Sequence, residues 1–117
     1  MKINSEGKLL KIFIGESDSY QGNPLYEVIV RTIKERGLSG ATVIRGIEGF
    51  GANSALRSTR LIDLSNDLPI VIEIIEEEEN IQMILPLINQ LIEKVNAGAL
   101  LTLENVQIVK YSPSRPL

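Results

Sequence analysis

The chain has 117 residues, a formal net charge of −3, and no histidine, cysteine or tryptophan. Without His or Cys it lacks the side chains for Ser-His-Asp catalysis, Cys-His catalysis and thiolate zinc sites. The acidic balance and the few aromatic residues disfavour nucleic-acid binding. The length predicts a single domain, and no apolar run approaches the roughly 20 residues of a membrane span. We therefore expect a cytoplasmic protein without a metal site.

The first half of the chain predicts a strand, a helix and a second strand. Residues 8–15 form a short apolar run that ends in glycine, which is typical of a strand. The run Gly22–Pro24 offers a breaker, an N-cap residue in Asn23, and a proline for the first helical position. Apolar residues at helical spacing then predict a helix over 24–36 that glycine ends. Residues 41–45 predict the second strand.

The second half predicts a β-branched strand followed by a longer helix. Residues 69–75 (PIVIEII) are rich in β-branched side chains. The run Glu76–Glu79 places four acidic side chains at a helix start, where the helix dipole favours negative charge. Pro86 is expected to kink this helix, and Gly98 is expected to end it. The apolar stripe of the helix consists of Ile81, Ile84, Leu85, Ile88, Ile92 and Val95.

A last strand over 100–111, interrupted near residues 104–105, completes the order β-α-β-β-α-β. That order is typical of the ferredoxin-like fold of the α+β class, in which an antiparallel four-stranded sheet carries two helices on one face. We therefore predict a single ferredoxin-like domain over residues 1–111, followed by a flexible C-terminal tail over 112–117.

The helix-free face of the predicted sheet carries much apolar surface. Alternation along the first and third strands places six residues on that face: Leu9, Lys11, Phe13, Val71, Glu73 and Ile75. Because so much apolar surface is unfavourable in water, we predict an oligomer that buries this face. Lys11 and Glu73 lie on adjacent strands of the predicted sheet. We favour a structural ion pair between them, inside the interface, over a site at a subunit junction.

A glycine-rich segment follows the second strand and opens a long connection over residues 47–67. The run Arg45–Gly51 (RGIEGFG) offers a positive charge and glycines whose backbone N–H groups can approach an anion closely. The alternative is a bulge and tight turn that need glycine for backbone reasons. The candidate ligand- or phosphate-binding residues are Arg45, Gly46, Gly49, Phe50, Gly51 and Arg57. We interpret the acidic residues Glu16 and Asp18 as part of a polar turn rather than a magnesium site.

Several short motifs occur together along the chain. They are Leu10–Glu16 (LKIFIGE), Gly22–Tyr26 (GNPLY), Gly40–Gly51 (GATVIRGIEGFG), Asp67–Glu73 (DLPIVIE) and Pro86–Leu87. In this combination the chain resembles the PII-like family catalogued as domain of unknown function 190, over about residues 8–111. The resemblance implies a ferredoxin-like subunit that assembles as a trimer. It also implies adenine nucleotides in clefts between subunits, and a loop between the second and third strands that engages partner proteins, often transporters.

The resemblance suggests a trimeric regulatory protein that binds AMP, ADP, ATP or a similar anion in intersubunit clefts and requires no cofactor. Residues 47–67 would form its ligand-responsive, partner-binding loop. The alternative is a ligand-independent interaction protein that docks a transporter or another partner. Relatives often carry a histidine at the position of Arg57, where this chain keeps a permanent positive charge suited to phosphate or carboxylate. Because no spacing selects a set of catalytic side chains, we do not expect an enzyme.

Overall fold

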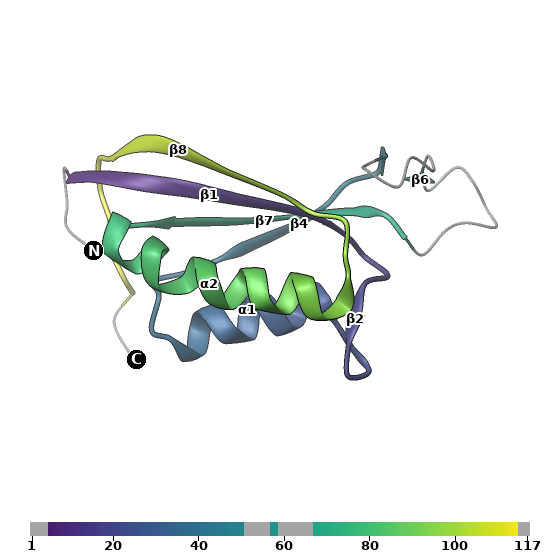
Figure 1. The fold of residues 1–117 in the computed structure, drawn as a ribbon. Coiled ribbons are helices and arrows are strands. Elements are labelled where there is room, and N and C mark those ends of the chain that lie inside the picture. Colours follow the sequence, from purple (N-terminus) through teal and green to yellow (C-terminus); the bar gives the residue numbers. More distant parts are fainter. Residues whose placement is uncertain (1–4, 51–56, 59–66, 115–117) are drawn as a thin grey trace.

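The computed structural model describes residues 5–50, 57–58 and 67–114. A four-stranded antiparallel sheet carries both α1 and α2 on one of its faces (Figure 1). In spatial order, the strands are β4 (Thr42–Arg45), β7 (Pro69–Glu76), β1 (Ser5–Gly15) and β8 (Leu100–Ile108). The helices are α1 (Leu25–Glu35) and α2 (Glu78–Val95). The predicted α+β class and ferredoxin-like order are therefore confirmed.

The core lies between the sheet and the two helices. Alternate residues of β1 and β7 are buried beneath the helices, namely Leu10, Ile12, Ile14, Ile70, Ile72 and Ile74. The helices meet them with Leu25, Ile29, Ile33, Ile81, Ile84 and Ile88. Each such side chain contributes about 1.5–3 kcal/mol when it is fully buried. The period of two along the strands and of 3.6 along the helices thus places the helix layer on one face of the sheet.

Two pairs of very short strands lie in the connections. They are β2 (Ser19–Tyr20) with β3 (Asn23–Pro24), and β5 (Glu48–Gly49) with β6 (Arg57–Ser58). Between β2 and β3, Gln21 and Gly22 both have positive φ angles, of 50° and 83°. This is the pattern of a two-residue type I′ hairpin turn, whose second position suits glycine. The predicted breaker before α1 is therefore the turn of a small hairpin.

The two ends of α1 agree with the prediction to within one residue. The helix begins at Leu25, with Pro24 as its N-cap. The expectation that Asn23 caps the helix and Pro24 occupies its first position is therefore wrong by one residue. At the other end, Gly37 has a φ of 79° and its N–H donates back to the helix, as a C-terminal glycine does.

Both ends of α2 differ from the prediction. The helix begins at Glu78, and Glu76 is instead the last residue of β7, where it is buried. The expectation of four acidic side chains at the helix start is therefore wrong for Glu76. Asn96, with a φ of 52°, ends the helix two residues before Gly98. Asparagine tolerates this left-handed conformation better than most residues. Pro86 lies inside α2, as predicted.

The strand β8 runs without a break and pairs with β1 over its whole length. The predicted interruption near residues 104–105 is therefore wrong. Both polar residues there find partners on β1, because Glu104 pairs with Lys11 and Asn105 accepts a hydrogen bond from Lys8. Residues 109–114 lie outside any helix or strand, and the rest of the predicted tail is outside the described residues. Neither helix is long and apolar enough to cross a membrane, within the part of the chain that the structure describes.

Candidate functional site

The candidate site lies at the end of the sheet where β1 and β4 end and β7 begins. The register pairs Gly15 with Pro69 and Arg45 with Ile70. The last residues of β1 and β4 therefore lie on either side of the first residues of β7. From β1 the chain enters the β1–α1 turn (Gly15–Asp18), and from β4 it enters the connection that leads to β7 (Figure 1).

Arg45 forms an ion pair with Glu16 of the β1–α1 turn. The guanidinium Nη2 of Arg45 contacts Oε2 of Glu16, and the two side chains are 57% and 18% exposed respectively. The carboxylate is thus largely enclosed, whereas the guanidinium remains open to solvent. A guanidinium carries five N–H donors in a planar fork, so it can bind a further oxyanion beside or in place of a carboxylate.

The β1–α1 turn also forms hydrogen bonds with the two residues that precede β7, at the end of the β4–β7 connection. The Ser17 N–H donates to Oδ1 of Asp67 at 3.0 Å, and the Glu16 N–H donates to the Leu68 carbonyl at 2.9 Å. The turn therefore contacts both ends of the β4–β7 connection, at Arg45 where the connection begins and at Asp67 where it ends.

Gly15 and Asp18 give the β1–α1 turn its shape. The Gly15 N–H donates to Oδ2 of Asp18 at 3.1 Å, and the Asp18 carbonyl accepts the Leu25 N–H at 2.8 Å. A Cβ atom on Gly15 would lie 2.9 Å from Oδ1 of Asp67, so a larger residue here would displace the Asp67 carboxylate. Burial raises the pKa of the Asp18 carboxyl, the Gly15 hydrogen bond opposes that rise, and the charge of Asp67 adds to it. Among the described residues, no group of three acidic side chains is arranged to hold a metal ion.

Gly46 and Gly49 lie so close to Pro69 that a side chain at either position would be crowded. The Gly46 N–H donates to the Pro69 carbonyl at 2.7 Å. A Cβ atom would lie 2.7 Å from Cγ of Pro69 if placed on Gly46, and 3.2 Å if placed on Gly49. These contacts favour the structural interpretation of the two glycines. Because the Gly46 N–H is already paired, the charge of Arg45 matters more than this glycine for holding an anion.

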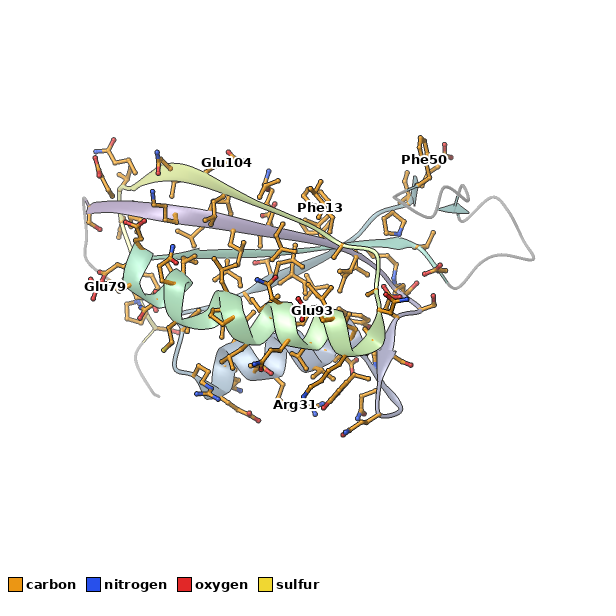
Figure 2. The ribbon with its side chains drawn as sticks, viewed as in Figure 1. Phe13, Arg31, Phe50, Glu79, Glu93 and Glu104 are labelled. Carbon is orange, nitrogen blue, oxygen red and sulfur yellow. The ribbon has the colours of Figure 1, made fainter. Side chains whose placement is uncertain are left out.

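The other predicted ligand residues lie further along the connection. Phe50 and its neighbour Ile47 are 73% and 75% exposed, and Phe50 projects away from the sheet (Figure 2). The backbone of Arg57 pairs with β5. Gly51 lies outside the described residues, as does most of the predicted loop over 47–67. The connection thus presents two large apolar side chains to solvent within five residues of Arg45 in the sequence.

The helix-free face of the sheet is built as predicted along β1 and β7. The register pairs Leu9 with Ile75, Lys11 with Glu73, and Phe13 with Val71. In the single chain Lys11 forms its ion pair with Glu104 of β8, at 3.5 Å, and the pair with Glu73 inside an oligomer stays a prediction. Ile44 and Leu100, which are not among the six predicted residues, are exposed and extend the apolar surface onto the two edge strands. Continuing the alternation into the edge strands would have found them.

At the opposite end of the sheet, Glu76 is a buried carboxylate that the sequence analysis missed. It is 2% exposed. Its Oε2 accepts the Ser39 N–H and hydroxyl, each at 2.5 Å, and its Oε1 accepts from Nδ2 of Asn80 at 2.9 Å. Burial acts to raise the pKa of the Glu76 carboxyl, but hydrogen bonds from Ser39, Asn80 and the Glu77 backbone outweigh it and lower that pKa. The alternation along β7 could have indicated its burial, because every second residue from Ile70 faces inward and Glu76 is the last of them.

A hollow at this same end is acidic. The charged residues that line it are Glu6, Lys8, Glu77, Glu78 and Glu79. Four carboxylates against one ammonium disfavour an anionic ligand. Carboxylates also surround the β1–α1 turn, but Arg45 remains the better candidate for an anionic ligand because its guanidinium is exposed and is oriented by an ion pair.

Comparison with known proteins identifies relatives in bacteria and archaea. The model of the family DUF190, described as "Uncharacterized ACR", matches residues 7–108. A UPF0166 protein of Aquifex aeolicus (strain VF5) is 43% identical over 102 residues, covering 87% of this chain and 92% of that protein. A UPF0166 protein of Methanocaldococcus jannaschii is 34% identical over 105 residues, covering 90% of this chain and 94% of that protein.

Solved structures share the fold. CPII, a nitrogen regulatory PII-like protein from Thiomonas intermedia K12 bound to ADP, AMP and bicarbonate, gives a TM-score of 0.68 at 17% identity over 90% of both chains. A protein from Thermus thermophilus described as PII-like gives 0.61 at 24% identity, over 90% of this chain and 91% of that one. At these identities the likeness establishes the fold alone. Since the family model spans nearly the whole described domain and two relatives exceed 30% identity, the chain belongs to the DUF190 family.

Proposed function

We propose that this chain is a cytoplasmic, trimeric PII-like regulatory protein that binds AMP, ADP, ATP or a similar anion in clefts between its subunits. In this proposal Arg45 binds the anion, Gly46 and Gly49 shape the turn beside it, and the connection contributes Phe50, Gly51 and Arg57. Residues 47–67 respond to the ligand and contact a partner protein such as a transporter. The response requires the ligand to bind one arrangement of this segment more tightly than another. The protein acts by binding, so no chemical step is assigned.

The observation that carries this proposal is the placement of Arg45. Its side chain is exposed, it ends a strand of the main sheet, and its guanidinium is oriented by Glu16. An oriented guanidinium on a rigid element needs little ordering before it binds an oxyanion. The related fold of CPII supports a nucleotide as the ligand, because that protein is bound to ADP and AMP.

The helix-free face supports the proposed trimer. Phe13, Ile44, Ile75 and Leu100 are all exposed there in the single chain, and such a surface is typical of an interface. Multi-angle light scattering at micromolar concentration should give three times the chain mass of 12.9 kDa. A monomer under these conditions would contradict both the trimer and the intersubunit site.

Calorimetry with AMP, ADP and ATP tests the ligand. Arg45→Gln removes a charge-assisted contact, whose loss weakens binding by about 10- to 100-fold. Arg31→Gln is the matched control, because Arg31 is an exposed arginine on α1 (Figure 2). The proposal predicts heat for at least one nucleotide with the wild type and the control, and much weaker binding with Arg45→Gln. No heat with any nucleotide would reject it.

The second candidate function is a ligand-independent interaction protein that docks a transporter or another partner. The exposure of Ile47 and Phe50 favours it, because neighbouring exposed apolar side chains are typical of contact surfaces. The contacts of Gly46 and Gly49 with Pro69 fit it as well, since they give the glycines a structural role. A partner that co-purifies with or without nucleotide, and that is lost on the double change Ile47→Ser and Phe50→Ser, would favour this function.

A further inference from the structure

We propose that Glu16 is an internal counter-anion for Arg45, so that an anionic ligand must compete with the Glu16 carboxylate for the guanidinium. This inference rests on the proposed function, because it concerns the same site. The Arg45–Glu16 pair joins the end of β4 to the β1–α1 turn, although β7 separates β4 from β1 in the sheet. The ion pair therefore bridges the start of β7 and joins β4 to the β1–α1 turn, two segments that are not paired as strands.

Glu16 is the acidic residue of this turn whose carboxylate pairs with an arginine side chain rather than with a backbone N–H group of the turn. Its backbone N–H is bonded to the Leu68 carbonyl at 2.9 Å, so the turn keeps this contact when the side chain rotates away from Arg45. The other two carboxylates are held by backbone N–H groups of the turn, Asp18 by Gly15 and Asp67 by Ser17. The structure thus pairs one adjustable carboxylate with the exposed guanidinium and fixes the others.

The charges around this turn determine which anions can displace the Glu16 carboxylate from the Arg45 guanidinium. An anion that approaches Arg45 meets the negative charges of Glu16, Asp18 and Asp67, so a weakly interacting anion gains little there. A phosphate group with two negative charges and three acceptor oxygens binds a guanidinium more strongly than a carboxylate does. An anion therefore occupies Arg45 only if it binds the guanidinium more strongly than Glu16 does. A phosphate group meets this condition, whereas acetate, which is itself a carboxylate, does not.

The test compares variants that change one charge each. Glu16→Gln keeps the side-chain size and an oxygen acceptor for Arg45 but removes the competing charge. Glu79→Gln removes the same charge from an exposed side chain at the far end of the molecule from Phe50, and is the matched control (Figure 2). Glu16→Asp keeps the charge but withdraws it by one methylene, and provides a second variant if Glu16→Gln does not fold. Affinities for ADP and for acetate are measured by calorimetry.

The expected result is that Glu16→Gln binds ADP about three- to tenfold more tightly than the wild type, the range of an ion pair that is only partly exposed. Its affinity for acetate should rise as well, because acetate competes with the same carboxylate for Arg45. The affinity of Glu16→Asp for ADP should fall between those of the wild type and Glu16→Gln. The affinity of Glu79→Gln should equal that of the wild type. If the wild type binds ADP and Glu16→Gln binds it equally or more weakly, this inference is overturned while the proposed function stands. If neither binds ADP, both fail; binding by Glu16→Gln alone supports the inference.

Discussion

Replacement of Glu76 tests how a buried carboxylate holds the end of the sheet opposite Arg45. Glu76→Gln keeps the shape of the side chain but exchanges one carboxylate oxygen for an NH₂ donor. In the native protein Oε2 accepts two hydrogen bonds from Ser39, and Oε1 accepts one from Asn80. If the amide oxygen of the variant faces Ser39, its NH₂ group faces Asn80, whose own amide can turn to accept it. The variant then keeps its contacts and loses their charge assistance.

The expected loss follows from these contacts. Hydrogen bonds to charged groups contribute about 1.5–3 kcal/mol each and neutral ones about 0.5–1.5 kcal/mol. The lower cost of burying a neutral amide offsets part of the difference, so the free energy of unfolding should fall by about 2 kcal/mol. With an unfolding entropy of about 2.1 cal/mol/K per residue over 117 residues, this lowers Tm by about 8 °C. Calorimetry should compare both proteins at one concentration, because the Tm of an oligomer depends on it.

The difference between the two proteins should also depend on pH. The pKa of Glu76 is lowered by folding from its ordinary value of 4.5, so ionisation of this carboxyl stabilises the fold. That stabilisation is complete above about pH 4.5 and is lost as the pH falls through the lower folded pKa. The Tm gap between wild type and Glu76→Gln should therefore narrow in acid. A variant as stable as the wild type at neutral pH, or a gap that does not narrow, would refute this reasoning.

Three further changes probe other parts of the molecule. Gly46→Ala should lower the free energy of unfolding by about 1–3 kcal/mol in chemical denaturation, because its Cβ would meet Pro69 at 2.7 Å, whereas Gly40→Ala has open space and should change little. Phe13→Ser removes apolar surface from the helix-free face and should shift the oligomer toward monomer in light scattering across a dilution series; an unchanged mass would argue against burial of that face. Asn96→Ala should cost about 1 kcal/mol at its φ of 52°, and Asn96→Gly should not; equal Tm values would contradict the cap assignment.

The sequence predicts well those parts of the fold that are determined by residues close together in the chain. The period of two in β1 and β7 and the helical stripes identify the sheet, the helix layer and the helix-free face. The end of α2 is less accurate, because Asn96 and Gly98 can both end a helix. The break expected near residues 104–105 fails because side chains of β1 provide partners for the polar residues there.

Contacts between distant segments are the parts that the sequence does not predict. Arg45 is recognisable as a candidate from the glycines that follow it, but its partner Glu16 comes close only through the strand order β4-β7-β1. Ser39 and Glu76 are 37 positions apart, and the acidic run that follows Glu76 hides its different role. The sequence leaves both explanations of Gly46 open, and the position of Pro69 then gives this glycine a structural reason.

A crystal structure of the protein with ADP tests the central claim most directly. The proposal predicts a trimer that buries the helix-free face, with ADP in a cleft between two subunits and a phosphate oxygen about 3 Å from the Arg45 guanidinium. It further predicts that the Glu16 carboxylate has turned away from Arg45 while the Glu16 N–H remains bonded to Leu68. An ADP molecule bound away from Arg45, or a saturating concentration of ADP that leaves this site empty, would contradict the proposed function.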